Sequence, residues 1–268
     1  MPNSDVVEAL VTAINYDRFD EIQSLHHPGV VFHSFRSPML RDSVAVRDFH
    51  HELLQRYADC TYTEVEVVED GGLIALRATI EAKGYDWRAF QQRVLDVVRI
   101  EDGLIVDRRL YGMMRDIELD KPTLAAMDDA EAFRGGSPRN TRKLVRGLYE
   151  KLIAGDREEA AGFLDEKVAL IDSVYGIVSG VDAVLDLLDA TPGPAFGYPR
   201  LIGVVAGEND AAVEIAIDPA RPRIADWARV VEGKVKVIER HWMLREIGIN
   251  PFVEYSRDRH SRQVILPK

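Results

Sequence analysis

The chain has 268 residues, 46% of them hydrophobic and 29% charged, so it can bury a core for one large domain or two of moderate size. Its formal net charge of -11, with no long run of Lys or Arg, argues against nucleic-acid binding. The apolar stretches are shorter than the roughly 20 residues of a membrane span, and the N-terminus lacks a secretory pattern, so we expect a soluble, cytoplasmic protein.

Three features of the sequence limit its chemistry. Cys60 is the only cysteine, which excludes an internal disulfide and a thiolate metal cluster. The histidine pairs His26-His27 and His50-His51 are adjacent in sequence and are not expected to converge on one metal. The sequence also has no glycine-rich phosphate loop. We therefore expect neither a metal nor a cofactor.

The first half of the chain predicts helices followed by strands. Apolar residues at helical spacing predict a helix over residues 6–14, Asp17 is expected to open a second short helix, and Phe49 falls in a third. The apolar period then changes to two, which is typical of strands. Such strands are expected over residues 64–68, 73–80, 93–100 and 104–111.

The second half repeats this order. Asp17 is matched by Asp156, and further matches follow along the chain at a separation that only shrinks, as a duplicated unit with shorter loops would produce. The charged stretch that ends in Gly135-Gly136 is interpreted as a linker. We predict domain 1 over residues 1–116, a linker over 117–138, and domain 2 with a C-terminal tail over 139–268.

Helices followed by a meander predict an α+β unit whose helices cover one face of a curved, mostly antiparallel sheet. The strand motifs "VVFHSF" and "VALIDSV", and the hairpins "DVVRIEDGLIVDRRLYG" and "DWARVVEGKVKVIERHW", resemble the NTF2-like superfamily, which includes SnoaL-like polyketide cyclases and ketosteroid isomerase. The resemblance covers residues 4–116 and 139–250. It implies two tandem cone-shaped units that form an intrachain pseudo-dimer, with a further homodimer left open.

The strand alternation places Asp96 and Asp226 among inward apolar neighbours. Both match the oxyanion-hole aspartate of ketosteroid isomerase in the pattern D-x-x-R. The resemblance to ketosteroid isomerase implies that a neutral Asp226 donates a hydrogen bond to a developing oxyanion. An aspartate that only shapes the pocket is the alternative.

Asp172 falls where the resemblance places a general base, whereas the first copy has Ser34 there. A carboxylate at this position could remove a proton from a carbon acid, or activate water or a hydroxyl. The alternative is a turn aspartate at the end of a strand. Glu214 is the candidate second carboxylate, and Tyr175 is a further supporting candidate.

Aromatic residues complete the candidate site. The helix tyrosine of the isomerase corresponds to Leu148 here, and Tyr149, one place later, is expected to face elsewhere. Four aromatic side chains are expected to line the pockets. They are Trp242, Tyr198, Tyr85 and Trp87.

The sequence therefore predicts a cofactor-independent acid-base enzyme for a hydrophobic small molecule, of the isomerase, cyclase, dehydratase or epoxide-hydrolase type. Its site would lie mainly in the second domain, with Asp172 and Asp226 as catalytic residues. The alternative is a non-catalytic small-molecule-binding or scaffold protein with two pockets. Neither nucleic acid nor a membrane is an expected partner.

Overall fold

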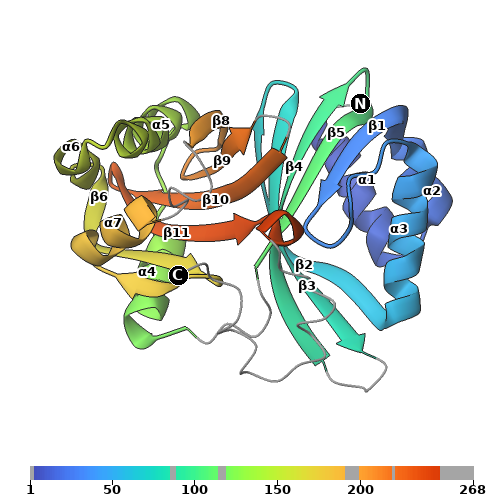
Figure 1. The fold of residues 1–268 in the computed structure, drawn as a ribbon, viewed down its shortest axis with the longest axis horizontal. Helices are drawn as coiled ribbons and strands as arrows, with labels where there is room; N and C mark the ends of the chain where they lie inside the picture. The colour runs from blue at the N-terminus through green and yellow to red at the C-terminus, as the bar shows by residue number, and fades with distance from the viewer. Residues whose placement is uncertain (1–2, 85–88, 114–118, 191–198, 219–220, 248–268) are drawn as a thin grey trace. The chain divides into compact units, whose positions relative to one another are not determined.

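The computed structural model of the chain describes residues 3–84, 89–113, 119–190, 199–218 and 221–247. Two compact units divide the chain. The first comprises Met1–Asp116 and Met243–Lys268, and the second comprises Ile117–Trp242. Figure 1 labels the helices and strands of both.

The first unit begins with helices and ends with a meander of strands. In chain order its elements are α1 (Asn3–Asn15), α2 (Phe19–Leu25), β1 (His26–Ser34), α3 (Ser43–Arg56), β2 (Tyr57–Asp70), β3 (Leu73–Gly84), β4 (Ala89–Glu101) and β5 (Leu104–Gly112). The short 3-10 helix η2 (Leu244–Ile247) also belongs to this unit.

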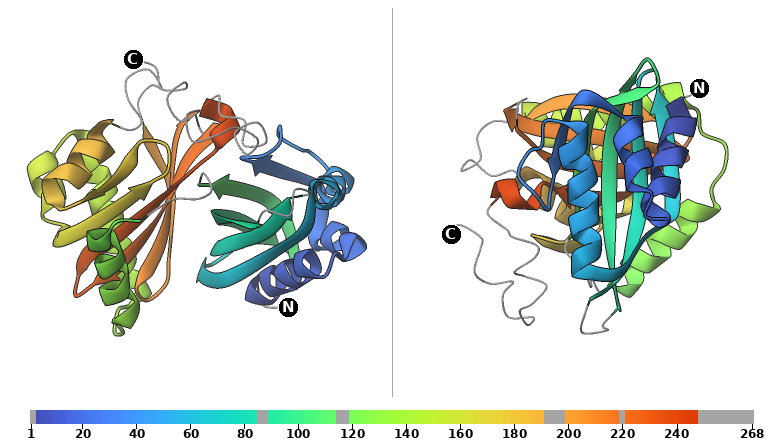
Figure 2. Two further views of the ribbon diagram at one scale, coloured as in Figure 1. Left: turned by 90° about the horizontal axis from the view of Figure 1, so that it is seen from below. Right: turned by 90° about the vertical axis from the view of Figure 1, so that its right-hand side faces the viewer.

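The strands β2, β3, β4 and β5 pair antiparallel in sequence order, and β1 adds to β5 in parallel. Helices α1 and α3 pack against these strands. The right-hand view of Figure 2 shows the three helices in front of the sheet. The sheet face that meets the helices is therefore enclosed, and polar side chains on it are removed from water.

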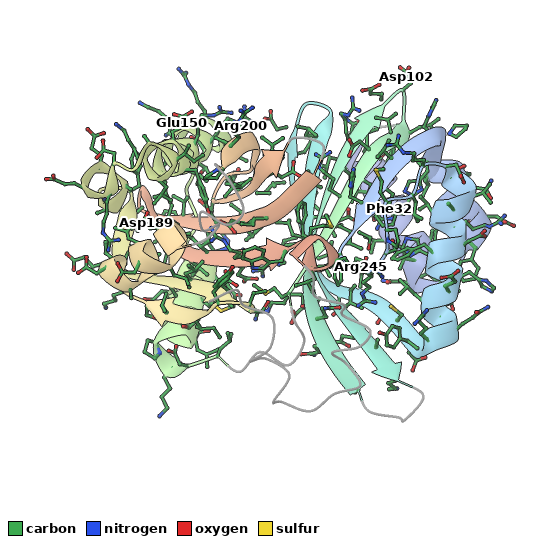
Figure 3. All side chains as sticks on the ribbon, viewed as in Figure 1. Phe32, Asp102, Glu150, Asp189, Arg200 and Arg245 are labelled. Carbon is green, nitrogen blue, oxygen red and sulfur yellow. The ribbon has the colours of Figure 1, made fainter. Side chains whose placement is uncertain are left out.

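Helix α3 illustrates why the sequence folds this way. The Asp42 side chain accepts a hydrogen bond from Ala45 N at 2.6 Å, which satisfies a backbone donor at the start of the helix. Phe49 on its buried face meets Phe32 of β1 edge to face, with ring centroids 5.2 Å apart. Figure 3 labels Phe32 between sheet and helix. Burying a side chain of this size stabilises the fold by roughly 1.5–3 kcal/mol.

The second unit repeats this order after an additional helix, with one more short strand, β7, between β6 and α7. These elements are α4 (Lys121–Ala132), α5 (Pro138–Ala154), α6 (Arg157–Ala161), β6 (Leu164–Asp172), β7 (Gly176–Ser179), α7 (Val181–Ala190), β8 (Arg200–Ala206), β9 (Asp210–Asp218), β10 (Arg221–Val231) and β11 (Lys234–Trp242). Strands β8 to β11 pair antiparallel in order, β6 adds to β11 in parallel, and β7 pairs with β6. Helix α5 packs against β8, β9 and β11.

The predicted α+β class, with helices on a mostly antiparallel sheet, is confirmed in each unit. None of the helices in the described part of the chain is long and apolar enough to cross a membrane.

The predicted domain limits differ from the two units in the region expected as a linker. Residues 117–138 contain α4, which packs against β6, β7, β10 and β11 of the second unit. The Asp120 side chain caps α4 by accepting from Thr123 N at 2.9 Å. The buried face of α4 consists of small side chains, including Ala126 and Ala130. Such a face gives little hydrophobic periodicity, so the charged residues around it dominated the sequence pattern.

The structure also groups the end of the described chain, expected in domain 2, with the first unit. Met243 and Leu244 are buried there. Arg245 donates through Nη1 to the carbonyl oxygen of Arg36, at 3.1 Å. These contacts join residues about 200 positions apart, and local sequence patterns carry no signal for them.

The turns between α1 and α2 and between α5 and α6 correct the predicted match of Asp17 with Asp156. Asp156 caps α6, accepting from Glu159 N at 3.3 Å. The equivalent cap of α2 is Arg18, whose backbone angles are nearly the same, and its side chain makes no capping bond. Asp17 has a left-handed φ of 55°, as Gly155 has one of 74°. Asp17 is therefore the structural equivalent of Gly155.

Candidate functional site

Three buried charged side chains form a row across neighbouring strands of the second unit. Arg240 on β11 lies opposite Asp172 on the parallel strand β6 and opposite Asp226 on the antiparallel strand β10. Both aspartates have 0% of their surface exposed. Residues directly opposite in a ladder share one face of the sheet. The register therefore places the two predicted acids on either side of one guanidinium group.

Asp226 is an acceptor on both of its oxygens. Arg240 donates through Nε to Oδ1 at 2.9 Å and through Nη2 to Oδ2 at 2.8 Å. The Tyr149 hydroxyl donates to Oδ2 at 2.5 Å. Both oxygens of Asp226 are thus occupied as acceptors, and neither is left to donate a hydrogen bond to a ligand. Asp226 is therefore not the neutral hydrogen-bond donor that was expected from the sequence. The resemblance gave no indication that Arg240 would pair with it.

Tyr149 is 1% exposed and Leu148 0%, so both successive residues of α5 are buried. Burial and the nearby Asp226 carboxylate raise the pKa of Tyr149 well above its ordinary value, so its hydroxyl keeps its proton. The expectation that Tyr149 faces elsewhere is wrong. The buried stripe of this helix is wide enough to include two consecutive residues.

Asp172 is held through one oxygen. Oδ1 accepts from Val174 N at 2.9 Å, from Tyr175 N at 3.1 Å and from Trp242 Nε1 at 3.0 Å. Within the described part of the chain, Oδ2 has no hydrogen-bond partner. Burial raises the pKa of Asp172 to about 6, against the opposite effects of the Arg240 charge and of the three hydrogen bonds. The side chain is fixed in orientation, and its second oxygen is buried without a hydrogen-bond partner among the described residues.

The supporting residues predicted for this site have different positions. Tyr175 donates its backbone N–H to Asp172, and its ring centroid lies 5.4 Å from that of Trp242. Glu214 lies opposite Ala225, which alternates with Asp226 along β10. It therefore projects from the other face of the sheet and does not join the site. Tyr198, Tyr85 and Trp87 lie outside the described residues.

The first unit buries a different constellation. Asp96 is 2% exposed, and its Oδ2 accepts from Arg108 Nε at 2.8 Å. Asp96 Oδ1 has no hydrogen-bond partner among the residues that the structure describes. Burial raises the pKa of Asp96, although Arg108 opposes this. Ser34, the counterpart of Asp172, is buried and accepts from Arg36 N through its hydroxyl oxygen.

His50 of α3 adds a neutral imidazole to this constellation. Arg108 Nη1 lies 3.1 Å from His50 Nε2. Because a guanidinium only donates, Nε2 must accept, and the ring proton is assigned to Nδ1. Burial and then the charge of Arg108 hold the pKa of His50 well below its usual range. The imidazole is neutral near physiological pH.

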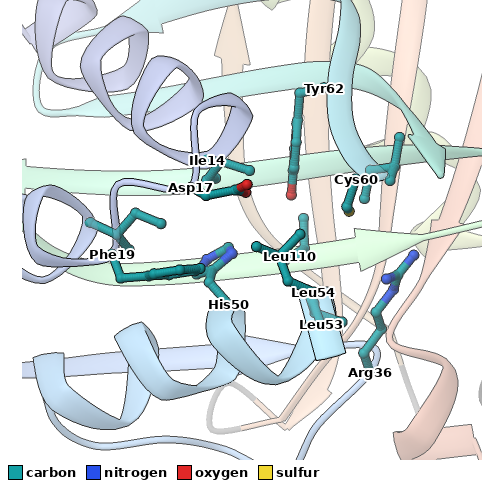
Figure 4. Close-up of a pocket in the computed structure, with 12 residues that line it drawn as sticks. Ile14, Asp17, Phe19, Arg36, His50, Leu53, Leu54, Cys60, Tyr62 and Leu110 are labelled. Carbon is teal, nitrogen blue, oxygen red and sulfur yellow. The ribbon is translucent and has the colours of Figure 1, made fainter. Parts of the chain in front are cut away.

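A pocket opens beside this cluster, and Figure 4 shows its walls. Its cavity volume is about 20 Å³, close to the room that one water molecule needs, so side chains fill most of it. Most of its walls are apolar, from α1, α2, α3 and the sheet. The residues lining it are Ile14, Asp17, Phe19, Ile22, Arg36, His50, Leu53, Leu54, Cys60, Tyr62, Ile80 and Leu110.

The sequence analysis did not predict Arg240 and Arg108 as site residues, because the two arginines occupy different positions in the two units. Arg240 lies directly opposite Asp226, whereas Arg108 lies opposite Val98, two residues from Asp96. Alternation of Arg240 with the apolar Ile238 and Trp242 along β11 was the available signal. Comparison of the two halves of the sequence hid this signal, since Arg108 and Arg240 do not align.

The described residues contain no group of three or more His, Cys, Asp or Glu side chains that could hold a metal ion. The polar side chains around Arg240 and those around Arg108 are instead hydrogen-bonded largely to one another. The chemistry that the described residues can supply is proton transfer by Asp172 and hydrogen bonding by the tyrosine, histidine and arginine side chains.

Comparison with known proteins gives a family-model match for part of the chain. Residues 7–108, within the first unit, match the family model described as SnoaL-like domain. A search of curated proteins found no significant match.

Several solved structures resemble part of the fold. IdmH from Streptomyces antibioticus, a candidate polyketide cyclase, has 22% identity and a TM-score of 0.39, over 42% of this chain and 92% of its own. An NTF2-like protein of unknown function from Burkholderia pseudomallei has 16% identity and a TM-score of 0.40, over 42% and 91%. A protein with a ketosteroid isomerase-like fold from Catenulispora acidiphila has 10% identity and a TM-score of 0.38, over 40% and 83%.

The resemblance inferred from the sequence is thus confirmed by the family model over residues 7–108. Residues 7–108 of the first unit are thus similar in sequence to SnoaL-like domains.

Proposed function

We propose that the protein is a cofactor-independent acid-base enzyme that acts on a hydrophobic small molecule, with its catalytic site in the second unit. Asp172 is the general base of this proposal. The observation that carries it is the geometry of this carboxylate, in which Oδ1 is fixed by three donors while Oδ2 has no hydrogen-bond partner among the described residues.

A base works best when its pKa is near the working pH, because it is then ionised and still binds a proton well. Burial brings the pKa of Asp172 to about 6, so the carboxylate is mostly ionised at pH 7. It would take a proton from an activated carbon or a hydroxyl of the substrate through Oδ2, and return it in a later step. Isomerisation, cyclisation, dehydration and epoxide opening all include such a transfer.

Arg240 and Tyr149 act as positioning residues in this proposal. Arg240 is anchored on both oxygens of Asp226, and the Tyr149 hydroxyl closes the same carboxylate from α5. The anchored positive charge lowers the pKa of Asp172 and prevents burial from raising it further. The Asp226–Arg240 pair therefore tunes the base without contacting the substrate.

The test uses exchange of the α-protons of 2-tetralone for deuterium, followed by proton NMR in D₂O. This ketone is an apolar carbon acid, so exchange reports proton removal without knowledge of the natural substrate. We expect the full chain to accelerate exchange and D172N to reduce the acceleration by roughly 100-fold or more. D172E, which keeps a carboxylate, should recover part of the rate. Equal rates for the wild type and D172N would contradict the proposal.

A non-catalytic binding protein is the second candidate function, because Asp172 and Asp226 are both 0% exposed. It predicts that 2-tetralone binds without any exchange above the buffer rate. Saturation-transfer NMR on the same samples measures binding directly. Binding without exchange supports the second candidate, whereas exchange that depends on Asp172 supports the first.

A further inference from the structure

The second-unit acid is buried, whereas a general base has to meet its substrate. Asp172 is 0% exposed, and its neighbours Arg240 and Trp242 on β11 are each 1% exposed. The segment that follows Asp172 is different, since residues 173–180 are all half-buried. Among the described segments that contact Asp172, the turn from β6 into β7 is therefore the one that can be displaced with the least loss of burial.

Residues 173–176 form a turn that closes on Asp172 itself. The backbone N–H groups of Val174 and Tyr175 both donate to Asp172 Oδ1, at 2.9 and 3.1 Å. The ring of Tyr175 packs on Trp242, with centroids 5.4 Å apart and planes at 38°. Trp242 Nε1 donates to the same oxygen of Asp172 at 3.0 Å. The half-buried Tyr175 ring thus lies against a side chain that contacts the acid.

Each end of β7 has a glycine whose backbone conformation disfavours other residues. The φ angle is 139° at Gly176 and 89° at Gly180. A Cβ added at either position would meet no heavy atom of the described residues within 4 Å beyond its chain neighbours. Glycine is therefore required by the backbone and not by a lack of space. In the first unit, residues 35–42 follow Ser34 and contain no glycine.

The two ends of β7 are held unequally. Among the described residues, β7 pairs with β6 and with no other strand. At its far end Gly180 N donates to the carbonyl oxygen of Val168 at 2.7 Å, and Gly180 accepts from Val184 N at the start of α7. The Tyr175 end depends on the contacts with Asp172 and Trp242. A short, half-buried segment of this kind opens locally at a lower free energy than the core.

We propose that residues 173–176 are the gate of the second-unit site, and that a ligand reaches Asp172 when the Tyr175 ring leaves Trp242. Backbone rotation at Gly176 carries Tyr175 away and exposes Oδ2 of the acid. Trp242 keeps its hydrogen bond to Oδ1, so the carboxylate stays oriented in the open state. This inference rests on the proposed function of Asp172 and adds the step that admits the substrate.

The test measures access to Asp172 in the full chain with a water-soluble carbodiimide and glycinamide at pH 6, followed by peptide mapping by mass spectrometry. The reagent reaches a carboxyl group only while that group is open to solvent, so the labelling rate reports opening and not catalysis. We expect Asp226 to be labelled at least about 10-fold more slowly than Asp172, because Arg240 and Tyr149 close it from the sheet and from α5.

The Tyr175 variants test the ring contact. Y175A removes the ring and keeps the backbone N–H that donates to Asp172. We expect it to speed up labelling of Asp172 by about 3- to 10-fold, the change in the opening equilibrium that the loss of one aromatic pair produces. Y175F keeps the ring and should be labelled at the wild-type rate.

Two glycine variants form a matched pair. Alanine is strained at both positive φ angles, so G176A and G180A should both lower the melting temperature. G176A strains the closed turn and should speed up labelling of Asp172, as Y175A does. G180A strains the other end of β7 and should leave the ratio of Asp172 to Asp226 labelling as in the wild type.

Three results would overturn the gate. They are equal labelling of Asp172 in Y175A and the wild type, equal labelling of Asp172 and Asp226 in the wild type, and an equal rise in G176A and G180A. The 2-tetralone assay separates the gate from the base. Labelling that depends on Tyr175 without proton exchange supports the gate and contradicts the base. Exchange that depends on Asp172, with no effect of Y175A on labelling, supports the base and contradicts the gate.

Discussion

The two units place their buried charges at different points of the same framework. In the second unit Arg240 lies directly between two aspartates, and Asp226 is satisfied on both oxygens. In the first unit Arg108 meets Asp96 diagonally and contacts His50 on its other side. A shift of two residues along one strand keeps the guanidinium on the same face but changes its partners. Equivalent folds can thus support different chemistry.

Apart from the pair Asp96 and Asp226, each unit also has an acid that the other lacks. In the second unit this acid is Asp172, at the end of β6, where the first unit has Ser34. In the first unit it is Asp17 at the helix turn, where the second unit has Gly155. Each unit therefore has a carboxylate at a position where the other has none.

Removal of the arginines should give the largest difference between the units. R240M leaves Asp226 and Asp172 buried beside no cation, and we expect it to lower the free energy of unfolding by about 3–5 kcal/mol. R108M leaves only Asp96 uncompensated, and its already raised pKa eases protonation. We expect R108M to cost at least about 1 kcal/mol less than R240M.

Urea denaturation followed by circular dichroism measures both arginine variants. The double variant R240M/D226N, which removes one uncompensated charge, should regain part of the loss. If R240M and R108M lower the free energy of unfolding equally, the two flanking aspartates do not make Arg240 more important for stability than Arg108.

The pH dependence of stability should isolate Asp172. Its folded pKa of about 6 lies above the ordinary aspartate pKa of 3.8, so the folded state binds the proton more tightly. The stabilising contribution of protonation is complete below pH 3.8 and is lost as pH rises through 6. Between pH 4 and pH 8 the wild type should lose about 3 kcal/mol more stability than D172N. Parallel pH profiles for the two proteins would contradict the raised pKa.

The tyrosines should show a smaller contrast. Y149F removes a hydrogen bond to the fully buried carboxyl group of Asp226, which is also paired with Arg240, and should cost about 1.5–3 kcal/mol. Y62F removes a hydrogen bond to Arg108, which keeps its ion pair with Asp96. We expect Y62F to cost about 1 kcal/mol. Thermal denaturation of both variants tests this order, which a larger loss in Y62F would reverse.

The helix turns should give the smallest effects, of opposite sign. D17G relieves a left-handed aspartate and should raise the free energy of unfolding by up to about 1 kcal/mol. G155D introduces one and should lower the free energy of unfolding by about 1–2 kcal/mol. Chemical denaturation of this reciprocal pair tests whether the two positions are equivalent. A loss of stability in D17G would show instead that the Asp17 side chain supports the fold.

The fold was largely predictable because its determinants are local and periodic. The alternation of Val94, Asp96 and Val98 predicted a buried aspartate on β4, and the structure shows Asp96 2% exposed. Helix α4 was not predictable in the same way. Its buried residues are small, and the contacts that hold it come from strands distant in sequence.

The site was predictable only in part. The alternation of side chains along the strands identified which aspartates face inward, but it could not identify their partners. Tyr149 and Arg240 reach Asp226 from a helix and from a neighbouring strand, so their contacts depend on tertiary register. The structural counterpart of Asp17 was hidden for a different reason. Its match with Asp156 in sequence is off by one residue, and only the backbone angles show that Gly155 is its counterpart.

The central claim is that Asp172 is a buried base with a pKa near the working pH. The most direct measurement is a titration of the aspartate side-chain carboxyl carbons by ¹³C NMR, for the wild type and D172N. The account predicts one carboxyl resonance that titrates at about pH 6 and is missing from the spectrum of D172N. A wild type with no aspartate titrating near this pH, or a resonance that persists in D172N, would contradict it.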